Sequence, residues 1–407
     1  MYSAQKIAEL TKTYRDGLLT DVLPFWLNNG VDRQYGGVIS SIDRDGSIVD
    51  TDKCVWVQGR FAWLLGELYN HPLCQDHPNR RQWLDVAQSI LEFITSHAFD
   101  PADGRMWFHL TREGKPIRKR RYAFSESFAA IAFGELALAT RKQEYAELAR
   151  SCFERFVSHN LDPQNVTPKF TMTRPSQSIG FPMITINTAS QLRDSIDLDD
   201  ASEWIDRSIE TIKQNFIKPE IQCVMETVGP DGSLLDHFDG RTLNPGHAIE
   251  GAWFIMSEGE HRRDNAMIQT GLQMLDWMWE RGWDQESGGL LYFVGVDERP
   301  VQEYWHDMKF WWPHNEAIIA TLLAAKLTGD EKYVRWHQQV HDWSYKHFAD
   351  SEFGEWFGYL HRDGSISSPL KGNLWKGPFH LPRMQLTCWE ICELGQDDSI
   401  NQINHLI

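Results

Sequence analysis

Residues 311–327, WWPHNEAIIATLLAAKL, join a short polar cluster to a long apolar run. Proline is tolerated at the entry of a helix but not in its interior, so Pro313 marks the start of a helix beside His314 and Glu316. The run that follows is apolar all round, which is typical of a helix buried on every side. The stretch therefore predicts a buried helix with polar side chains at its N-terminal end.

The same arrangement recurs along the chain at intervals of 60 to 67 residues. The residues that mark the polar clusters are Arg60, Glu126, Asn187, His247, His314 and His380. Such regular spacing is typical of repeated copies of one structural unit. Because each copy places its cluster at an equivalent position, we expect the clusters to converge on one end of the molecule.

Amphipathic patterns between the apolar runs predict a second set of helices, each with one exposed face. These segments are residues 7–18, 81–97, 142–159, 201–216, 262–281 and 331–348. Turn pairs that interrupt short aromatic or β-branched runs predict a β-hairpin before every cluster except the third. The turn pairs are Asp45-Gly46, Glu113-Gly114, Asp231-Gly232, Asp297-Glu298 and Asp363-Gly364.

Alternating amphipathic and apolar helices predict an all-α fold, with an outer ring of six helices around an inner ring of six. This is an (α/α)6 barrel with short β-hairpins and the polar clusters at one end. Repeat barrels grow as one ring of units, so residues 1–407 are predicted to form a single catalytic domain. The composition, 42% hydrophobic and 24% charged, is that of a globular protein.

A formal net charge of -17 repels phosphate backbones and anionic lipids, so it argues against nucleic-acid and membrane partners. One local exception is the basic run Arg118-Lys119-Arg120-Arg121 in a predicted loop. Such a run forms either a solvated face or a receptor for an anionic effector.

The six cysteines are scattered without zinc-binding or redox-motif spacing, and the N-terminus lacks the apolar stretch of a signal peptide. These features predict a cytoplasmic protein. No run of about 18 apolar residues is present, so no membrane span is expected.

Aromatic residues are abundant, with 18 Trp, 11 Tyr and 21 Phe, and many of them adjoin the polar clusters. Flat rings beside Arg, Asn, Glu and His side chains favour a sugar site, because rings pack on C–H faces and polar groups match hydroxyls. The alternative is that the tryptophans only fill the core between the two rings of helices.

His247 and His380 occupy matching positions two units apart, so their imidazoles can approach a bound carbon from different sides. This arrangement suits abstraction of a C–H proton next to a carbonyl and its return to the opposite face. Arg60 is the natural donor to the resulting enediolate, and Glu250 can orient His247 or hold a hydroxyl.

Several segments, in order and over nearly the whole chain, together resemble the N-acylglucosamine 2-epimerases, also described as renin-binding proteins. These segments are KCVWVQGR (53–60), NPGH (244–247), WWPHNEA (311–317), EWFGY (355–359) and KGPFHLPR (376–383). The resemblance implies an (α/α)6 barrel that interconverts N-acetylglucosamine and N-acetylmannosamine through the open-chain sugar. It also implies a homodimer activated by ATP or another nucleotide, which is not consumed.

By the same resemblance, His247 and His380 are the catalytic pair. The other residues that match substrate or catalytic positions are Arg60, Phe124, Lys169, Asn187, Glu250 and Glu316. His314 is a further candidate for substrate binding, although its spacing from Glu316 leaves open which of the two faces the substrate. No metal is expected, because His247 and Glu250 lack a convincing third ligand.

Related enzymes remain as alternatives on the same barrel. A cellobiose-type 2-epimerase is expected to carry histidine near Asn187, whereas an aldose-ketose isomerase acting on mannose would return the proton to C1. A glycoside hydrolase would need paired carboxylates from Glu126, Glu250 and Glu316 but not two matched histidines. A protein-binding module would need a sustained heptad or a large apolar seam, and no sustained heptad is found.

Overall fold

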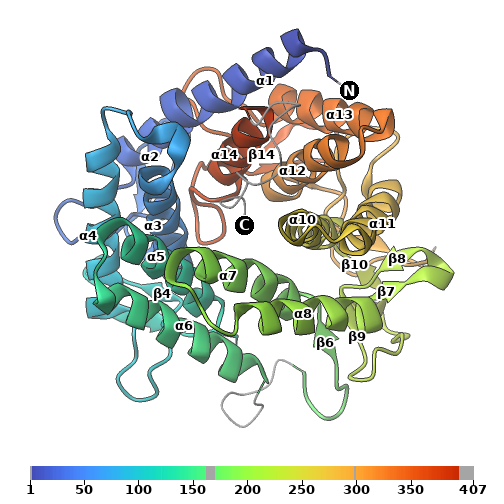
Figure 1. The fold of residues 1–407 in the computed structure, drawn as a ribbon, viewed down its shortest axis with the longest axis horizontal. Helices are drawn as coiled ribbons and strands as arrows, with labels where there is room; N and C mark the ends of the chain where they lie inside the picture. Colours follow the sequence, from blue (N-terminus) through green and yellow to red (C-terminus); the bar gives the residue numbers. More distant parts are fainter. Residues whose placement is uncertain (1, 121, 162–169, 298, 394–407) are drawn as a thin grey trace.

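The computed structural model describes residues 2–120, 122–161, 170–297 and 299–393, and it is mostly helical (Figure 1). An inner and an outer set of helices alternate along the chain and form a ring (Figure 1). The inner helices are α3 (Val55–Asn70), α5 (Phe124–Thr140), α7 (Gly180–Ile196), α10 (Pro245–Arg262), α12 (Trp311–Thr328) and α14 (His380–Glu393). The outer helices are α1 (Ala4–Asp16), α4 (Arg80–His97), α6 (Gln143–Leu161), α8 (Ala201–Thr211), α11 (Asn265–Gly282) and α13 (Glu331–His347).

Shorter helical elements complete or link these helices. They are α2 (Leu23–Asn29), α9 (Phe238–Arg241), π-helical turns at Gly17–Val22 and Ile212–Phe216, and 3-10 turns at Pro72–Cys74 and Pro219–Ile221. The predicted outer segment 201–216 therefore changes from α-helix to π-helix after Thr211. The segment predicted at 262–281 begins later, at Asn265, because Arg263 adopts a left-handed φ of 58° and Asp264 caps α11.

The two sets of helices differ in burial as their sequence patterns predict. In α12, every residue from Trp311 to Ala325 is buried. In α13, by contrast, the buried residues follow one stripe that includes Tyr333, His337, Val340 and Ser344. Full burial of one large apolar side chain contributes about 1.5–3 kcal/mol, so packing between the rings is the main source of stability.

Short strands lie between the helices and pair antiparallel. They are β1 (Ser41–Ile42), β2 (Ile48–Asp50), β3 (Lys53–Cys54), β4 (His109–Leu110), β5 (Pro116–Arg118), β6 (Gln177–Ser178), β7 (Ile217–Lys218), β8 (Cys223–Val224), β9 (Thr227–Val228), β10 (Thr242–Leu243), β11 (Val294–Gly295), β12 (Lys309–Phe310), β13 (Tyr359–Leu360) and β14 (Ile366–Ser368).

Three of the predicted hairpins are confirmed. Asp45-Gly46, Glu113-Gly114 and Asp363-Gly364 connect β1 to β2, β4 to β5 and β13 to β14. The prediction is wrong at Asp231-Gly232, because β9 before it pairs with β6. The turn pair Asp297-Glu298 includes Glu298, which lies outside the described residues, and β11 before it pairs with β10. Those strands take partners from a different part of the chain, which a local turn signal cannot reveal.

A turn of sequence Asp-x-x-x-Gly follows four of the outer segments. The aspartates are Asp32, Asp100, Asp284 and Asp350, and each backbone carbonyl accepts the N–H of the glycine four residues later. Each carboxylate also pairs with a lysine further along the chain, at Nζ–O distances of 2.6 to 3.0 Å: Lys53, Lys119, Lys309 and Lys371. These pairs join each turn to the strand or loop that precedes the next inner helix.

Within the described ranges, none of the helices is both long and apolar enough to cross a lipid bilayer. The cysteines, all six of which the structure describes, are buried thiols without disulfide partners.

Candidate active site

A cavity of about 1390 Å³ opens among the polar clusters of the inner helices. Its lining includes most of the residues predicted for the site: Arg60 from α3, Phe124 from α5, Asn187 from α7, His247 and Glu250 from α10, and His380 from α14. The predicted convergence of distant clusters on one place is therefore confirmed for these residues.

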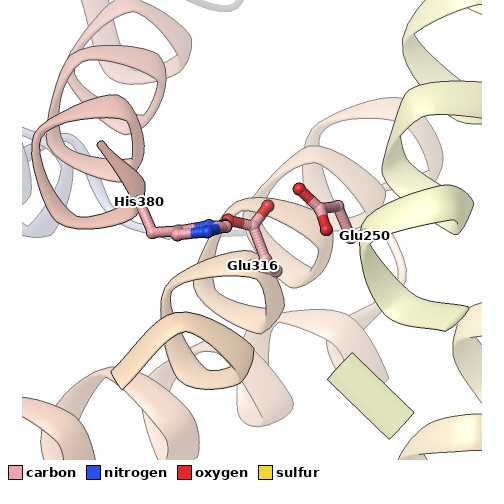
Figure 2. A group of neighbouring side chains, drawn as sticks. All are labelled: Glu250, Glu316 and His380. Atoms are coloured by element: carbon pink, nitrogen blue, oxygen red, sulfur yellow. Dashed lines mark hydrogen bonds and ion pairs between the residues drawn. The ribbon is translucent and has the colours of Figure 1, made fainter. Parts of the chain in front are cut away.

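His380 is anchored by Glu316, on the neighbouring helix α12. The imidazole Nδ1 lies 2.7 Å from Glu316 Oε1, and in Figure 2 the two side chains point toward one another. Since a carboxylate accepts, the hydrogen bond places the proton of a neutral His380 on Nδ1. The other ring nitrogen, Nε2, is then left with its lone pair for a substrate.

Both carboxylate oxygens of Glu316 accept hydrogen bonds from neighbouring side chains. Its Oε1 also accepts a hydrogen bond from Arg383 at 2.7 Å, and its Oε2 accepts one from the indole of Trp253 at 2.8 Å. The expectation that Glu316 binds the substrate does not fit this geometry, because its oxygens are engaged and it is fully buried behind His380. Glu316 instead positions the imidazole.

Glu250 faces this pair from α10 (Figure 2). Its Oε1 accepts a hydrogen bond of 2.6 Å from the same nitrogen of Arg383 that binds Glu316. No contact within the described residues occupies Oε2, and the side chain lines the cavity, so this oxygen can accept from a sugar hydroxyl. The expectation that Glu250 orients His247 is not met, because its partner is Arg383.

Glu250, Glu316 and His380 offer ligand atoms within 4.8 Å of one another, which is a spacing that a metal ion could use. The guanidinium of Arg383, however, bridges the two carboxylates. The cluster thus contains its own cation, and this donor set does not favour an added metal.

Burial lowers the pKa of His380 well below its usual range, and the guanidinium groups of Arg383 and Arg60 act in the same direction. The charge of Glu250 acts to raise this pKa, but the effects that lower it are larger in sum. His380 is therefore neutral at physiological pH, which is the form that accepts a proton.

His247 is anchored by Glu226, a residue outside the predicted site. The imidazole Nδ1 lies 3.0 Å from Glu226 Oε2 and 3.2 Å from Oε1. Glu226 lies in the link between β8 and β9 and lines the cavity. Both histidines are therefore held at Nδ1 by a carboxylate, and both line the same cavity.

Trp312 lies beside both imidazoles. Its ring centroid is 5.0 Å from that of His247 and 5.8 Å from that of His380. A ligand in contact with both histidines would also meet this indole, so Trp312 supports the sequence-based interpretation that rings adjoin a sugar site.

Arg60 packs against aromatic rings at the cavity wall. Its Cζ lies 4.0 Å from the ring centroid of Phe128, 4.7 Å from that of Phe379 and 4.8 Å from that of Trp56. Burial lowers its pKa to about 10, so the guanidinium keeps its charge at neutral pH. In the described part of the chain it has no hydrogen-bond acceptor, and its donors are available to a developing oxyanion.

His314 does not contact the cavity. Its Nδ1 donates to the carbonyl of Phe310 at 2.7 Å, and its Nε2 accepts the N–H of Leu290 at 2.9 Å. Burial lowers its pKa to about 3, which keeps it neutral. The prediction that His314 binds the substrate is therefore wrong, since both ring nitrogens serve the fold.

Lys169 lies outside the described residues, so its predicted role is not tested. Phe124 and Asn187 do line the cavity, and Asn187 comes from the middle of α7. Two residues of the site were not predicted, Arg383 and Glu226, whereas Trp253 is one of the aromatic residues that adjoin the polar clusters in the sequence. Helical spacing could have found Arg383, since it lies three positions after His380 and so shares its helix face.

Two carboxylate-held imidazoles and a charged arginine around one cavity form an acid–base site. The N-acylglucosamine 2-epimerase (GlcNAc 2-epimerase) family matches residues 36–380. N-acylglucosamine 2-epimerase from Bos taurus is 34% identical over an alignment of 397 positions that covers 95% of this chain and 93% of that protein. The chain belongs to the N-acylglucosamine 2-epimerase family.

Solved structures agree on the fold. Cellobiose 2-epimerase from Bacillus thermoamylovorans superposes with a TM-score of 0.81 at 18% identity, over 94% of this chain and 99% of that one. A D-mannose isomerase superposes with a TM-score of 0.79 at 18% identity, over 94% and 98%. At these identities the likeness concerns the fold alone.

Proposed function

We propose that this protein interconverts N-acetylglucosamine and N-acetylmannosamine by moving a proton at C2 of the open-chain sugar. The observation that carries the proposal is the pair of imidazoles, His247 and His380, each held at Nδ1 by a carboxylate and both lining one cavity. Membership of the N-acylglucosamine 2-epimerase family supports the choice of substrate.

In the proposed reaction, Nε2 of one histidine takes the C2 proton and the C–H electron pair moves toward the carbonyl oxygen. Arg60 donates to the enediolate oxygen that results, while Glu250 holds a hydroxyl through its open oxygen. The other histidine then returns a proton to the opposite face of C2, which inverts the stereocentre. His380 is suited to begin as the base because it is neutral.

We further propose that the ring of helices is a complete (α/α)6 barrel and that residues 1–407 form one catalytic domain. The alternation of inner and outer helices around a common centre supports this architecture (Figure 1). A nucleotide activator such as ATP, a homodimeric state and a cytoplasmic location stay predictions from the sequence. Six buried free thiols are compatible with a reducing compartment.

A cellobiose-type 2-epimerase or an isomerase acting on mannose would use the same histidines. The cavity volume of about 1390 Å³ accommodates sugars larger than one ring, so size does not separate these substrates. Asn187, which lines the cavity where a cellobiose epimerase is expected to carry histidine, favours the N-acyl sugars.

A glycoside hydrolase is disfavoured by the carboxylates. Glu126 is buried and accepts the N–H of Met106 at 2.9 Å, and Glu316 is saturated by Arg383, His380 and Trp253. Of the carboxylates proposed for that chemistry, only Glu250 faces the cavity, whereas glycosidases canonically use a pair.

The test is NMR of N-acetylmannosamine with the purified protein in D2O, with and without ATP. We expect N-acetylglucosamine carrying deuterium at C2. Conversion of mannose to fructose, or of cellobiose to its epimer, without turnover of N-acyl sugars would overturn the proposed substrate while keeping the histidine chemistry.

A further inference from the structure

Two segments that stand out in the sequence, EWFGY (355–359) and KGPFHLPR (376–383), meet in the structure through a buried ion pair. Lys376 Nζ donates to Oε2 of Glu355, and each of the two side chains is only 1% exposed. The same Nζ donates to the carbonyl of Lys371 at 2.9 Å. Neither charge takes part in the proposed reaction, so the acid–base chemistry does not account for the pair.

The ion pair lies beside the segment that leads into the catalytic helix α14. Residues 369–379 form an irregular link between β14 and α14. This link lines the cavity with Asn373, Trp375 and Phe379, and the helix that follows begins at His380. Because such a link lacks the regular hydrogen bonds of a helix or a strand, side-chain contacts must fix its position.

The stem of Lys376 packs against the backbone of the other segment at Gly358. A Cβ at Gly358 would lie 2.6 Å from Cδ of Lys376, so glycine gives the lysine room at this point. The carbonyl of Gly358 accepts the N–H of Trp311, the first residue of α12, at 3.0 Å. The ring of Trp311 lies 6.1 Å from that of His380 and 5.8 Å from Nζ of Lys376. The lysine therefore connects the start of α12 to the link that precedes α14.

Glu355 is held in place by contacts on the other side of the pair. Its backbone adopts a left-handed φ of 57°, which is uncommon for a residue other than glycine. Its N–H donates to Oδ1 of Asp21 at 2.9 Å, and its carbonyl accepts from Nζ of Lys371 at 3.2 Å. Lys371 also pairs with Asp350, one of the turn aspartates, at 3.0 Å. A residue kept in such a conformation by its surroundings is a fixed point to which Lys376 is attached.

We propose that Glu355 and Lys376 form a positioning pair that sets the place of His380 and of the cavity wall before it. The inference rests on the proposed function in taking His380 as an acid–base group, but it concerns how the imidazole is placed and not which sugar is bound. A buried ion pair often adds little net stability compared with apolar side chains of similar shape, because both charges lose their hydration. The pair does supply a specific geometry, since neither charge can leave the other without staying buried and unpaired.

The energetics of the two groups agree with this role. Burial raises the pKa of Glu355, against the opposing charges of Lys376 and Lys371, and burial lowers the pKa of Lys376. Each charge is therefore costly to keep without its partner. The placement of the imidazole matters for the rate, because a misplacement of about 1 Å can slow a reaction on the order of a hundredfold.

A double-mutant cycle tests the pair. Its members are Glu355→Gln, Lys376→Met and the double variant, in which two neutral side chains of similar shape replace the ion pair. Each single variant leaves one charge buried and unpaired, so we expect both to be less stable than the double variant, which should fold. We expect the double variant to lose at least about tenfold in kcat for N-acetylmannosamine with little change in KM. The losses in the single variants should not add, since either substitution already breaks the pair.

The matched control is Glu258→Gln on α10, the same chemical change at a fully buried glutamate. Glu258 pairs with Arg193 at 2.9 Å and lies about three helical turns after His247. This variant should lose stability, as measured by thermal unfolding, and keep the wild-type kcat.

NMR of the histidine imidazoles provides a second measurement that needs no sugar. The Cε1–H signal of His380 is assigned by its absence in His380→Asn. We expect this signal to shift in the double variant and to keep its wild-type position in Glu258→Gln.

The positioning pair is overturned if the folded double variant keeps the wild-type kcat or an unshifted His380 signal. It is also overturned if the losses in kcat add, if the double variant is no more stable than the single variants, or if Glu258→Gln loses as much kcat. The two proposals fail separately, because the NMR signal does not depend on turnover. A shifted His380 signal in the double variant of a protein that turns over no N-acyl sugar would keep the positioning pair and remove the proposed function. Turnover of N-acetylmannosamine by the wild type, with an unshifted signal in the double variant, would do the reverse.

Discussion

The two active-site carboxylates Glu226 and Glu316 hold equivalent histidines but differ in their other hydrogen-bond partners. Glu316 binds Arg383 and Trp253 as well as His380, so a fixed cation neutralises it. Glu226 makes its described hydrogen bonds to His247 only. In the reaction proposed above, this difference between the two carboxylates assigns the return of the proton to His247 and its abstraction to His380.

Replacing Glu226 by Gln should slow epimerisation more than it slows the exchange of the C2 proton with solvent. The amide can still accept the Nδ1 hydrogen bond but lacks the charge, so we expect kcat for epimerisation to fall by at least about tenfold with little change in KM. Deuterium exchange at C2 of the unconverted sugar should fall less, because His380 is untouched. NMR in D2O gives both rates from one sample.

A purely structural role for Glu226 predicts something different, namely that exchange and inversion fall together. The control is Glu220→Gln, the same chemical change on an exposed 3-10 turn, which should leave both rates at the wild-type value.

Arg60→Lys should lower kcat by roughly a hundredfold or more while KM changes much less. Lysine keeps the charge but not the planar fork, which contacts the three rings and, in the proposed reaction, donates to the enediolate oxygen. Steady-state kinetics in both directions measure the effect. Turnover equal to that of the wild type would remove Arg60 from the role of oxyanion donor.

Sequence reasoning found the site residues that carry their signal in helix-start motifs, such as Arg60, His247 and His380. It missed Glu226 because the link between β8 and β9 has no periodicity to follow. It wrongly included His314, since a histidine at the first turn of a helix can face either the cavity or its own backbone. Only the contacts with Phe310 and Leu290 decide between the two.

Among the elements, α1 and α13 are joined by a buried chain of tyrosine and histidine side chains that adjoins α14. Tyr14 Oη lies 2.9 Å from His337 Nε2 and 2.9 Å from His341 Nδ1, and Tyr2 Oη lies 2.6 Å from His337 Nδ1. Burial lowers the pKa of His337 well below its usual range and that of His341 to about 4. Both imidazoles are therefore neutral where the first outer helix meets the last (Figure 1).

These histidines should make the contact between α1 and α13 sensitive to acid. Because their pKa values are lower in the folded than in the unfolded state, the unfolded chain binds more protons below about pH 6.5. Their contribution to stability is complete above that pH and is lost as the pH falls toward about 4. We expect the double variant His337→Asn/His341→Asn to lose less unfolding free energy than the wild type between pH 7 and pH 5.

Urea unfolding at the two pH values measures this difference. Comparing each protein with itself removes the overall destabilisation that the substitutions cause. It also allows for Glu67 and Glu135, which titrate in both proteins, because burial raises their pKa values. An unchanged pH dependence would show that these histidines are not the acid-sensitive groups.

Periodicity in the sequence predicted the existence of the helices well, because a stripe or a uniform apolar run reports burial directly. Strand pairing was harder to predict. The strands are two or three residues long, and the partners of β9 and β11 lie about 50 residues away. The Asp-x-x-x-Gly turns are a signal that sequence reasoning did not use, although their repetition matches the repeat of the helices.

Across the whole molecule, three of those turns, at Asp32, Asp284 and Asp350, connect one repeat to the next through buried ion pairs. Asp284 pairs with Lys309 at 2.9 Å, and both side chains are almost fully buried. Arg362, from a later part of the chain, adds a second cation at 2.8 Å. Asp32 repeats this arrangement with Lys53 and Arg112, as does Asp350 with Lys371 and Arg44. Equivalent buried ion pairs therefore connect the repeats, in addition to the packing between helices.

Breaking one of these buried ion pairs should lower the free energy of unfolding far more than breaking an exposed ion pair. Asp284→Asn leaves Lys309 buried without its anion, and breaking a buried pair costs about 3–5 kcal/mol. The control is Asp276→Asn, which breaks a pair with Lys332 whose side chains are 34% and 32% exposed. Such pairs contribute about 0–1 kcal/mol. Chemical denaturation at pH 7 compares the two variants.

The pH dependence of Asp284→Asn gives a second check. The cations beside Asp284 hold the pKa of its carboxyl well below its usual range. Its contribution is present above the unfolded-state pKa of about 4 and is lost as the pH falls below that value. The gap in unfolding free energy between wild type and Asp284→Asn should therefore narrow as the pH falls from 5 toward 3. If this difference in unfolding free energy does not change with pH, the substitution acts through packing, and the ion pairs do not stabilise the contact between repeats electrostatically.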